Sequence, residues 1–206
     1  MCYYSKQSKD AIQLQARFNV TIEPDMNLTY HRSNGFTYPP LPVITNAMCG
    51  AVQLYNWGLI PTWAKDLSFR RNTLNARIET VTELASFRSS VNNRCLVPAD
   101  GFYEWKWLDA KGKTKQQFLL SLPDDELFAF AGIYNQWTDR STGEILNTFS
   151  IVTTEANELM SEIHHTKKRM PVILTPGNEK QWLNGANMLD FAKPEIDLIA
   201  REIKVY

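Results

Sequence analysis

Apolar residues recur along the chain at two spacings, one typical of helices and one typical of strands. The helical spacing appears four times. Ser8 caps the first helix, Thr80 and Glu83 form a capping box at the second, and Thr175 with Pro176 opens the fourth. The expected helices cover residues 8–18, about 80–91 and 155–163, and a stretch after Pro176 that carries Trp182 and Leu183.

Short runs rich in β-branched and aromatic residues lie between these helices and predict strands. Residues 19–42 are expected to be irregular, with turns at 33–35 and 38–42. The strands outnumber the helices and do not alternate with them, which argues against a doubly wound parallel sheet. The pattern favours an α+β, predominantly β fold: a curved, barrel-like antiparallel sheet with peripheral helices. The expected strands are Ala51–Trp57, Arg94–Val97, Gly101–Trp107, Gln117–Ser121, Leu127–Tyr134, Asn147–Thr153, Met170–Leu174 and Glu202–Val205.

No repeat, low-complexity tract or Gly/Ser linker divides the sequence, so residues 1–206 are expected to form a single domain. The 44% hydrophobic and 12% aromatic content supplies a sizeable core and excludes wholesale disorder. No apolar run approaches the ~18 residues of a membrane span, and the N-terminal residues lack a hydrophobic signal core. We therefore expect a cytoplasmic protein with no membrane partner.

Charge and cysteine content narrow the function further. The 22 basic and 22 acidic residues give a net charge of zero, which argues against a protein held on duplex DNA mainly by phosphate neutralisation. A nucleic-acid site would have to be a local groove. The three cysteines, Cys2, Cys49 and Cys95, are too few and too badly spaced for a zinc cage or a disulfide framework, so no metal or other cofactor is expected.

Cys2 is the first candidate for chemistry. If Met1 is removed, Cys2 carries a free α-amine beside its thiol, and this 1,2-aminothiol condenses with an aldehyde to a five-membered thiazolidine. The reference pKa values, ~7.7–8.0 for the amine and ~8.5 for the thiol, make both nucleophilic forms accessible near neutrality. The alternative is a chance cysteine after the initiator.

Glu104 is the second candidate. On a strand over 101–107, Phe102, Glu104 and Lys106 share one face, and aromatic residues line both faces. A carboxylate crowded by aromatics is desolvated, which raises its pKa and suits it to proton transfer. The alternative is a solvent-exposed Glu104–Lys106 pair.

Histidines and a polar loop supply the remaining candidates. His164 and His165 follow the helix over 155–163 and offer an acid or base near pH 7, or else form a solvated helix end. Asn75 is suited to orienting a reacting group, and Arg77 to gripping a phosphate, although either fits an ordinary loop. The segment 57–63 offers tryptophans near basic residues, as base stacking needs, although most such tryptophans belong to a core.

Taken together and in this order, these segments resemble the SOS response-associated peptidase (SRAP) family of abasic site processing proteins. The match runs from residue 2 to about 185. Its marks are Met1-Cys2, Trp57-Gly58-Leu59-Ile60-Pro61, Asn75-Ala76-Arg77-Ile78-Glu79-Thr80, Arg94-Cys95-Leu96-Val97-Pro98-Ala99-Asp100-Gly101-Phe102-Tyr103-Glu104-Trp105, and Ile163-His164 leading into Arg169-Met170-Pro171-Val172-Ile173-Leu174.

The resemblance implies a mostly β fold with a groove for single-stranded DNA. It also implies a monomeric shield for abasic sites in the DNA-damage (SOS) response, cytoplasmic and associated with the nucleoid when bound to damaged DNA. Cys2, freed of Met1 by self-processing or by an aminopeptidase, would attack the ring-opened sugar and form a stable thiazolidine, so peptidase, hydrolase and lyase-type activities are implied. The same resemblance implies a role for each candidate residue. Glu104 would carry protons, His164 would promote opening of the sugar and reversal of the link, and Asn75 would position the amine and the sugar. Arg77 and Arg169 would contact phosphates, and Pro39 and Trp63 would support the flanking bases.

Two departures from the family pattern affect these expectations. Members often begin Cys-Gly-Arg, whereas Tyr3 and Tyr4 follow Cys2 here, so a basic contact beside the nucleophile is missing. His164 stands five residues before Arg169 instead of two, which leaves His164 and His165 as alternatives.

Two rival functions use the same segments. One is a cysteine peptidase with a Cys2, His164 and Asn75 arrangement. The other is a non-covalent reader of modified bases that uses Trp57, Trp63 and the neighbouring basic loop.

Overall fold

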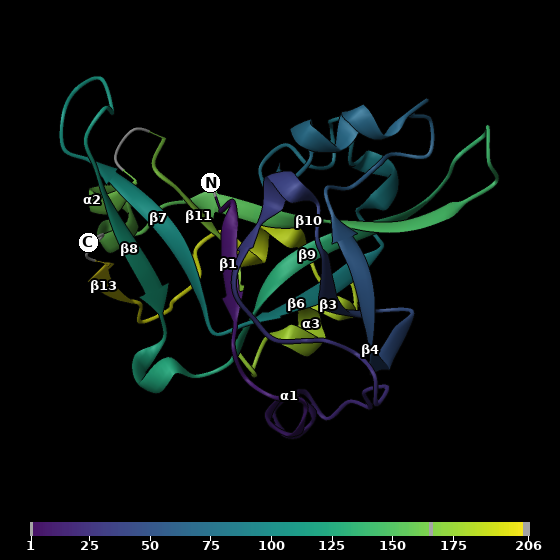
Figure 1. The fold of residues 1–206 in the computed structure, drawn as a ribbon, viewed down its shortest axis with the longest axis horizontal. Coiled ribbons are helices and arrows are strands. Elements are labelled where there is room, and N and C mark those ends of the chain that lie inside the picture. The colour runs from purple at the N-terminus through teal and green to yellow at the C-terminus, as the bar shows by residue number, and fades with distance from the viewer. Residues whose placement is uncertain (1, 165–166, 204–206) are drawn as a thin grey trace.

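The computed structural model describes residues 2–164 and 167–203, and its fold is predominantly β (Figure 1). The strands are β1 Tyr4–Gln7, β2 Tyr30–Asn34, β3 Pro40–Thr45, β4 Met48–Trp57, β5 Asn75–Arg77, β6 Arg94–Ala99, β7 Gly101–Trp107, β8 Lys115–Ser121, β9 Phe128–Thr138, β10 Ile145–Glu155, β11 Arg169–Pro171, β12 Ile173–Leu174 and β13 Ile199–Ile203. The α-helices are α1 Ala11–Phe18, α2 Glu158–Ile163 and α3 Glu179–Leu183. The 3-10 turns are η1 Gly35–Thr37, η2 Leu67–Asn72, η3 Arg88–Ser90, η4 Pro123–Asp125 and η5 Met188–Phe191.

Five strands close into a barrel. The hydrogen-bonded order runs β10, β4, β3, β6 and β9, and a further pairing between β9 and β10 closes the ring. The barrel-like sheet expected from the sequence is therefore confirmed. Its expected antiparallel character holds with two exceptions, because β4 and β5 each run parallel to β10. Both strands reach β10 through long connections, which parallel pairing requires.

A second sheet lies beside the barrel, and its strand order is β13, β8, β7, β1 and β2 (Figure 1). The chain passes from β6 in the barrel to β7 in this sheet at Asp100 and Gly101. Asp100 is buried, pairs with Lys6 at 2.5 Å, and accepts a hydrogen bond from the Ser8 backbone N–H at 3.0 Å. A Cβ on Gly101 would lie 2.9 Å from the Leu119 side chain and 3.1 Å from the Leu120 carbonyl oxygen, so the corner is tightly packed there. These contacts fix β1, and with it the N-terminal residues, against β7.

Apolar residues from both sheets meet in one cluster around the N-terminus. Cys2 is fully buried in this cluster. Within the described ranges, no helix is long and apolar enough to cross a membrane. The larger members come from β4, β7, β10 and α2. They include Trp57, Phe102, Phe149 and Met160.

The expected helices are partly confirmed. The first begins later than expected, because Asp10 rather than Ser8 is the cap and forms a capping box with Gln13. The third and fourth form as α2 and α3, and both are shorter than expected. The helix over 80–91 is wrong: that segment is a series of turns ending in η3. Its β-branched start, Thr80-Val81-Thr82, has low helix propensity.

The expected strands all form; β7 has the expected bounds and the others have changed bounds. The one over 170–174 divides into β11 and β12, and the last one lies at Ile199–Ile203, whereas Lys204 and Val205 are outside the described residues. The irregular assignment of residues 19–42 is wrong in part, because this stretch contains β2, η1 and the start of β3. β3 was missed because the prolines of 39–42 are typical of a turn, yet this strand pairs with both β4 and β6.

Candidate functional site

Residue 2 is fixed by two strands that are distant in sequence. β1 lies between β2 and β7, and Ser5 is opposite Phe102. From β5, the Asn75 side-chain amide donates a hydrogen bond to the Cys2 carbonyl oxygen at 2.9 Å. β5 is itself paired with β10 through Ile151. Asn75 therefore holds the backbone of Cys2, as a group that positions the N-terminal amine would.

The Cys2 thiol lies in an apolar environment and feels the charge of the Glu104 carboxylate. Burial raises the pKa of this thiol well above its usual value, and the nearby Glu104 carboxylate raises it further. Its sulfur lies 3.8 Å from the Tyr4 carbonyl oxygen. Burial thus favours the protonated thiol, so nucleophilic attack requires a group that takes the proton.

Glu104 is suited to receive that proton. The alternation predicted for β7 is present, with Phe102 and Glu104 buried and Tyr103 and Trp105 half-buried. The solvent-exposed Glu104–Lys106 pair is thereby ruled out, since Glu104 is only 5% exposed. Burial raises the pKa of Glu104 to about 7. Its charge also raises the pKa values of Cys2 and Tyr3.

His164 follows α2, the helix that packs against β7. It is half-buried, and its Nδ1 lies 3.1 Å from the Arg169 carbonyl oxygen. If Nδ1 donates to this oxygen, Nε2 is the basic nitrogen of the neutral ring. His165 lies outside the described residues, so the choice between the two histidines stays open.

The two arginines differ in their surroundings. Arg77 is exposed, whereas Arg169 is buried and pairs with both Glu79 carboxylate oxygens at 2.8 and 2.9 Å. Burial tends to raise the pKa of Glu79, but the Arg169 hydrogen bonds and charge help to hold it below its usual range. Arg169 also donates to the Thr153 carbonyl oxygen at 2.8 Å. Its guanidinium is thus already engaged by the protein.

A basic cavity of about 420 Å³ lies beside these arginines. Four of its lining residues are cationic and one is anionic, so it presents mostly positive charge to solvent. The lining residues are Arg77, Glu155, Ala156, Ser161, Lys167, Lys168 and Arg169.

The two tryptophans of segment 57–63 have different environments. Trp57 is fully buried and donates to the Leu74 carbonyl oxygen at 2.8 Å, so of the two alternatives left by the sequence it takes the core position. Trp63 is 49% exposed, and its ring makes an edge-to-face contact with Phe69 at 4.9 Å. Pro39 is half-buried and precedes β3. Trp63 and Pro39 remain candidates for contact with bases.

The sequence analysis missed a cation beside the N-terminal strand. Arg32 on β2 places its guanidinium 5.0 Å from the Tyr4 ring and 5.6 Å from the Trp105 ring. The strand that brings it there was expected to be irregular, so no local signal pointed to it. Arg32 therefore places a basic group on the aromatic side chains of β1 and β7.

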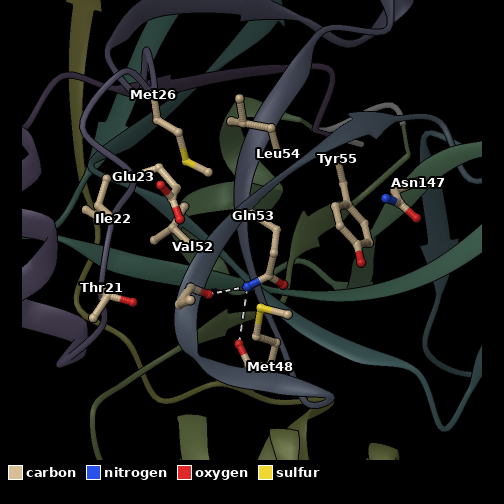
Figure 2. A pocket seen from close by; sticks show the side chains of 11 residues that line it. Thr21, Ile22, Glu23, Met26, Met48, Val52, Gln53, Leu54, Tyr55 and Asn147 are labelled. Atoms are coloured by element: carbon tan, nitrogen blue, oxygen red, sulfur yellow. Dashed lines mark hydrogen bonds between the residues drawn. The ribbon is translucent and has the colours of Figure 1, made fainter.

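A separate cavity of about 530 Å³ lies next to β4 (Figure 2). Met26, Val52 and Leu54 contribute apolar side chains to it, and the Gln53 amide is bonded to the backbone of its own strand. None of the candidate residues around Cys2 lines this cavity.

Comparison with known proteins gives consistent matches. The family model described as "SOS response associated peptidase (SRAP)" matches residues 1–202. Abasic site processing protein YoqW of Bacillus subtilis is 48% identical over 148 residues, which cover 71% of this chain and 63% of that protein. Abasic site processing protein HMCES of Gallus gallus is 34% identical and is covered over 45% of its length. A crystal structure of a protein from Bacteroides thetaiotaomicron aligns with a TM-score of 0.89 at 36% identity, covering 98% of this chain and 92% of that one.

Proposed function

This chain belongs to the SRAP family, and we propose that it captures abasic sites in single-stranded DNA as a covalent thiazolidine at Cys2. Several relatives are named abasic site processing proteins, and the matched region spans 63% of the length of YoqW. The observation that carries the proposal is the burial of both the Cys2 thiol and the Glu104 carboxylate, whose charge raises the pKa of that thiol. In addition, the Asn75 side-chain amide donates a hydrogen bond to the Cys2 carbonyl oxygen.

The proposed reaction begins with hydrolysis of the peptide bond between Met1 and Cys2, which consumes one water and releases methionine. The freed α-amine then adds to the aldehyde carbon of the ring-opened sugar, and the carbinolamine loses water to give an imine. The Cys2 sulfur attacks the imine carbon and closes the five-membered ring. Condensation therefore joins protein and DNA with the net loss of one water.

Glu104 is the proposed proton carrier. As a carboxylate it takes the proton from the Cys2 thiol, and as an acid it returns a proton to the nitrogen that becomes the ring amine. With a pKa of about 7, both forms are populated at neutral pH. An ordinary glutamate would be almost entirely ionised there and would be a poor acid.

His164 is proposed to protonate the departing atoms when the thiazolidine reopens, and to assist opening of the sugar ring. An imidazole suits both steps, because it gains and loses a proton near pH 7. Its position after α2, the helix that packs on β7, supports a place close to Glu104.

Arg77 and the basic cavity are proposed to hold the DNA backbone beside the lesion, since four cations line that cavity. Arg169 contributes there only if its bonds to Glu79 loosen. Pro39 and Trp63 are proposed to support bases that flank the abasic site, a role that suits the exposed Trp63 ring.

Self-cleavage at Met1 is the peptidase activity that we propose. A thiol–imidazole–amide peptidase would need Asn75 to orient the imidazole. Instead, the Asn75 amide nitrogen donates to Cys2, and its oxygen has no hydrogen-bond partner within the described part of the chain. This arrangement favours a role for Asn75 in positioning the N-terminus.

The test is incubation with a single-stranded oligonucleotide that carries one abasic site, followed by denaturing electrophoresis. Wild type should give a slowly migrating band, and Cys2→Ser should not. Cys49→Ser, which removes the exposed thiol, is the matched control and should react like wild type. A denaturation-resistant band with Cys2→Ser, or none with wild type, would refute the proposal. A non-covalent reader would bind equally well without Cys2.

A further inference from the structure

An aromatic pair lies beside the nucleophile. The ring of Tyr3 contacts the ring of Phe36 with centroids 4.8 Å apart and planes tilted by 38°. Tyr3 directly follows Cys2, whereas Phe36 belongs to η1 and is 49% exposed. We call this pair the aromatic shelf. Phe36 lies in the stretch that the sequence presented as irregular.

A hydrogen bond and a packing contact join the shelf to the body of the protein. The Gly35 backbone N–H donates to the Tyr3 carbonyl oxygen at 2.8 Å, which ties η1 to the N-terminal segment. On its other side Gly35 packs on the Trp57 ring, where an added Cβ would lie 3.2 Å away. Trp57 is fully buried in the cluster that also contains Cys2. The position of Phe36 is therefore set by the same core that positions the thiol.

Further aromatic and cationic side chains follow Phe36 in the chain. Tyr38 follows η1, and the Arg70 guanidinium lies 4.0 Å from its ring centroid. Arg70 neighbours Phe69, which in turn contacts Trp63. Beyond the shelf, Arg70 thus contacts the Tyr38 ring and Phe69 contacts Trp63. Aromatic faces with nearby positive charge are what unpaired nucleobases and their phosphates require.

We propose that the aromatic shelf is the stacking site for the nucleobase adjacent to the abasic sugar. The inference rests on the proposed function, which places the sugar at Cys2. An abasic nucleotide has no base of its own, so the neighbouring base is the first one that the protein meets. Tyr3 is one residue from the nucleophile, and Phe36 extends the surface toward solvent. Stacking of this kind tolerates any base, because every base has a π face.

The test uses single-stranded oligonucleotides with a tetrahydrofuran spacer, an abasic analogue that has no aldehyde. The fluorescent base 2-aminopurine, which is quenched by stacking, is placed on one side of the spacer in one probe and on the other side in a second. Wild type and Phe36→Tyr should quench one of the probes. Phe36→Leu, which keeps apolar bulk but loses the ring, should lose the quenching and bind about tenfold more weakly. Ile12→Ala, on the exposed side of α1 at the opposite end of β1, should behave like wild type.

A second arm replaces the neighbouring base by another spacer. Wild-type affinity should then fall about tenfold, whereas Phe36→Leu should lose little more, because its stacking partner is already gone. Equal losses in both proteins, or equal quenching by wild type and Phe36→Leu, would overturn the inference. If wild type forms the covalent adduct but quenches neither probe, the stacking role of the shelf is refuted and the proposed function still stands. Quenching without any adduct on aldehyde-bearing DNA would instead refute the proposed function.

Discussion

Replacing Glu104 by glutamine separates its chemistry from its shape. The side chain keeps its size, but it no longer titrates. Because Glu104 is buried, its pKa in the folded protein is about 7, against an ordinary value of 4.5. The folded state therefore binds more protons than the unfolded state between these values, and stability falls as pH rises through this window. Above pH 7 the buried charge costs about 3 kcal/mol, from 1.36 kcal/mol for each pKa unit.

Glu104→Gln is thus expected to be more stable than wild type at pH 8.5, by up to about 3 kcal/mol, and to lose most of that advantage at pH 5. Urea unfolding of both proteins at the two pH values measures this, and the wild-type-minus-variant difference cancels other titrating groups. At the same time the variant should form the adduct about 10²–10⁴-fold more slowly, because it cannot carry protons. A variant that is more stable only at pH 5, or one that reacts at the wild-type rate, would refute the role given to the Glu104 carboxylate.

The remaining predictions concern reversal, strand preference and DNA affinity. His164→Ala should make a preformed adduct exchange more slowly with excess unlabelled abasic DNA, because the departing atoms lose their proton donor. If His165→Ala blocks exchange and His164→Ala does not, the assignment of the histidine is wrong by one residue. Abasic sites in single strands should react faster than those in duplex, because opening a duplex costs a few kcal/mol; equal rates would count against a groove for a splayed strand. Arg77→Ala should weaken binding and reduce the slope of log affinity against log salt by about 0.7, the loss of one phosphate contact to single-stranded DNA. An unchanged slope would show that the exposed Arg77 side chain makes no such contact.

The sequence predicted much of the fold because its longer strands carry their own signal. β7 was predicted with its observed bounds, since alternation over Gly101–Trp107 is strong, and the same alternation predicted a desolvated Glu104. β1 and β5 were missed because four and three residues are too few to show a period. β3 was missed because its prolines resemble a turn, although the barrel places them where they can be accommodated.

The site was harder to predict because it depends on contacts that are distant in sequence. The hydrogen bond between Asn75 and Cys2 spans 73 residues, and no local pattern encodes it. Trp57 and Trp63 belong to one short segment, yet one is fully buried and the other is half exposed. Hydrophobicity does not distinguish them, since Trp57 is buried by contacts with residues distant in sequence, Leu74 and Phe149. The Tyr3–Phe36 contact likewise exists only because β2 and η1 return to the N-terminus.

The most direct test of thiazolidine formation is the intact mass of the denatured adduct. The proposed chemistry predicts a mass equal to the oligonucleotide plus the chain from Cys2 to Tyr206, less one water. A mass that includes Met1, or one without the loss of water, would contradict an aminothiol condensation at Cys2. So would an adduct that forms after the α-amine has been acetylated.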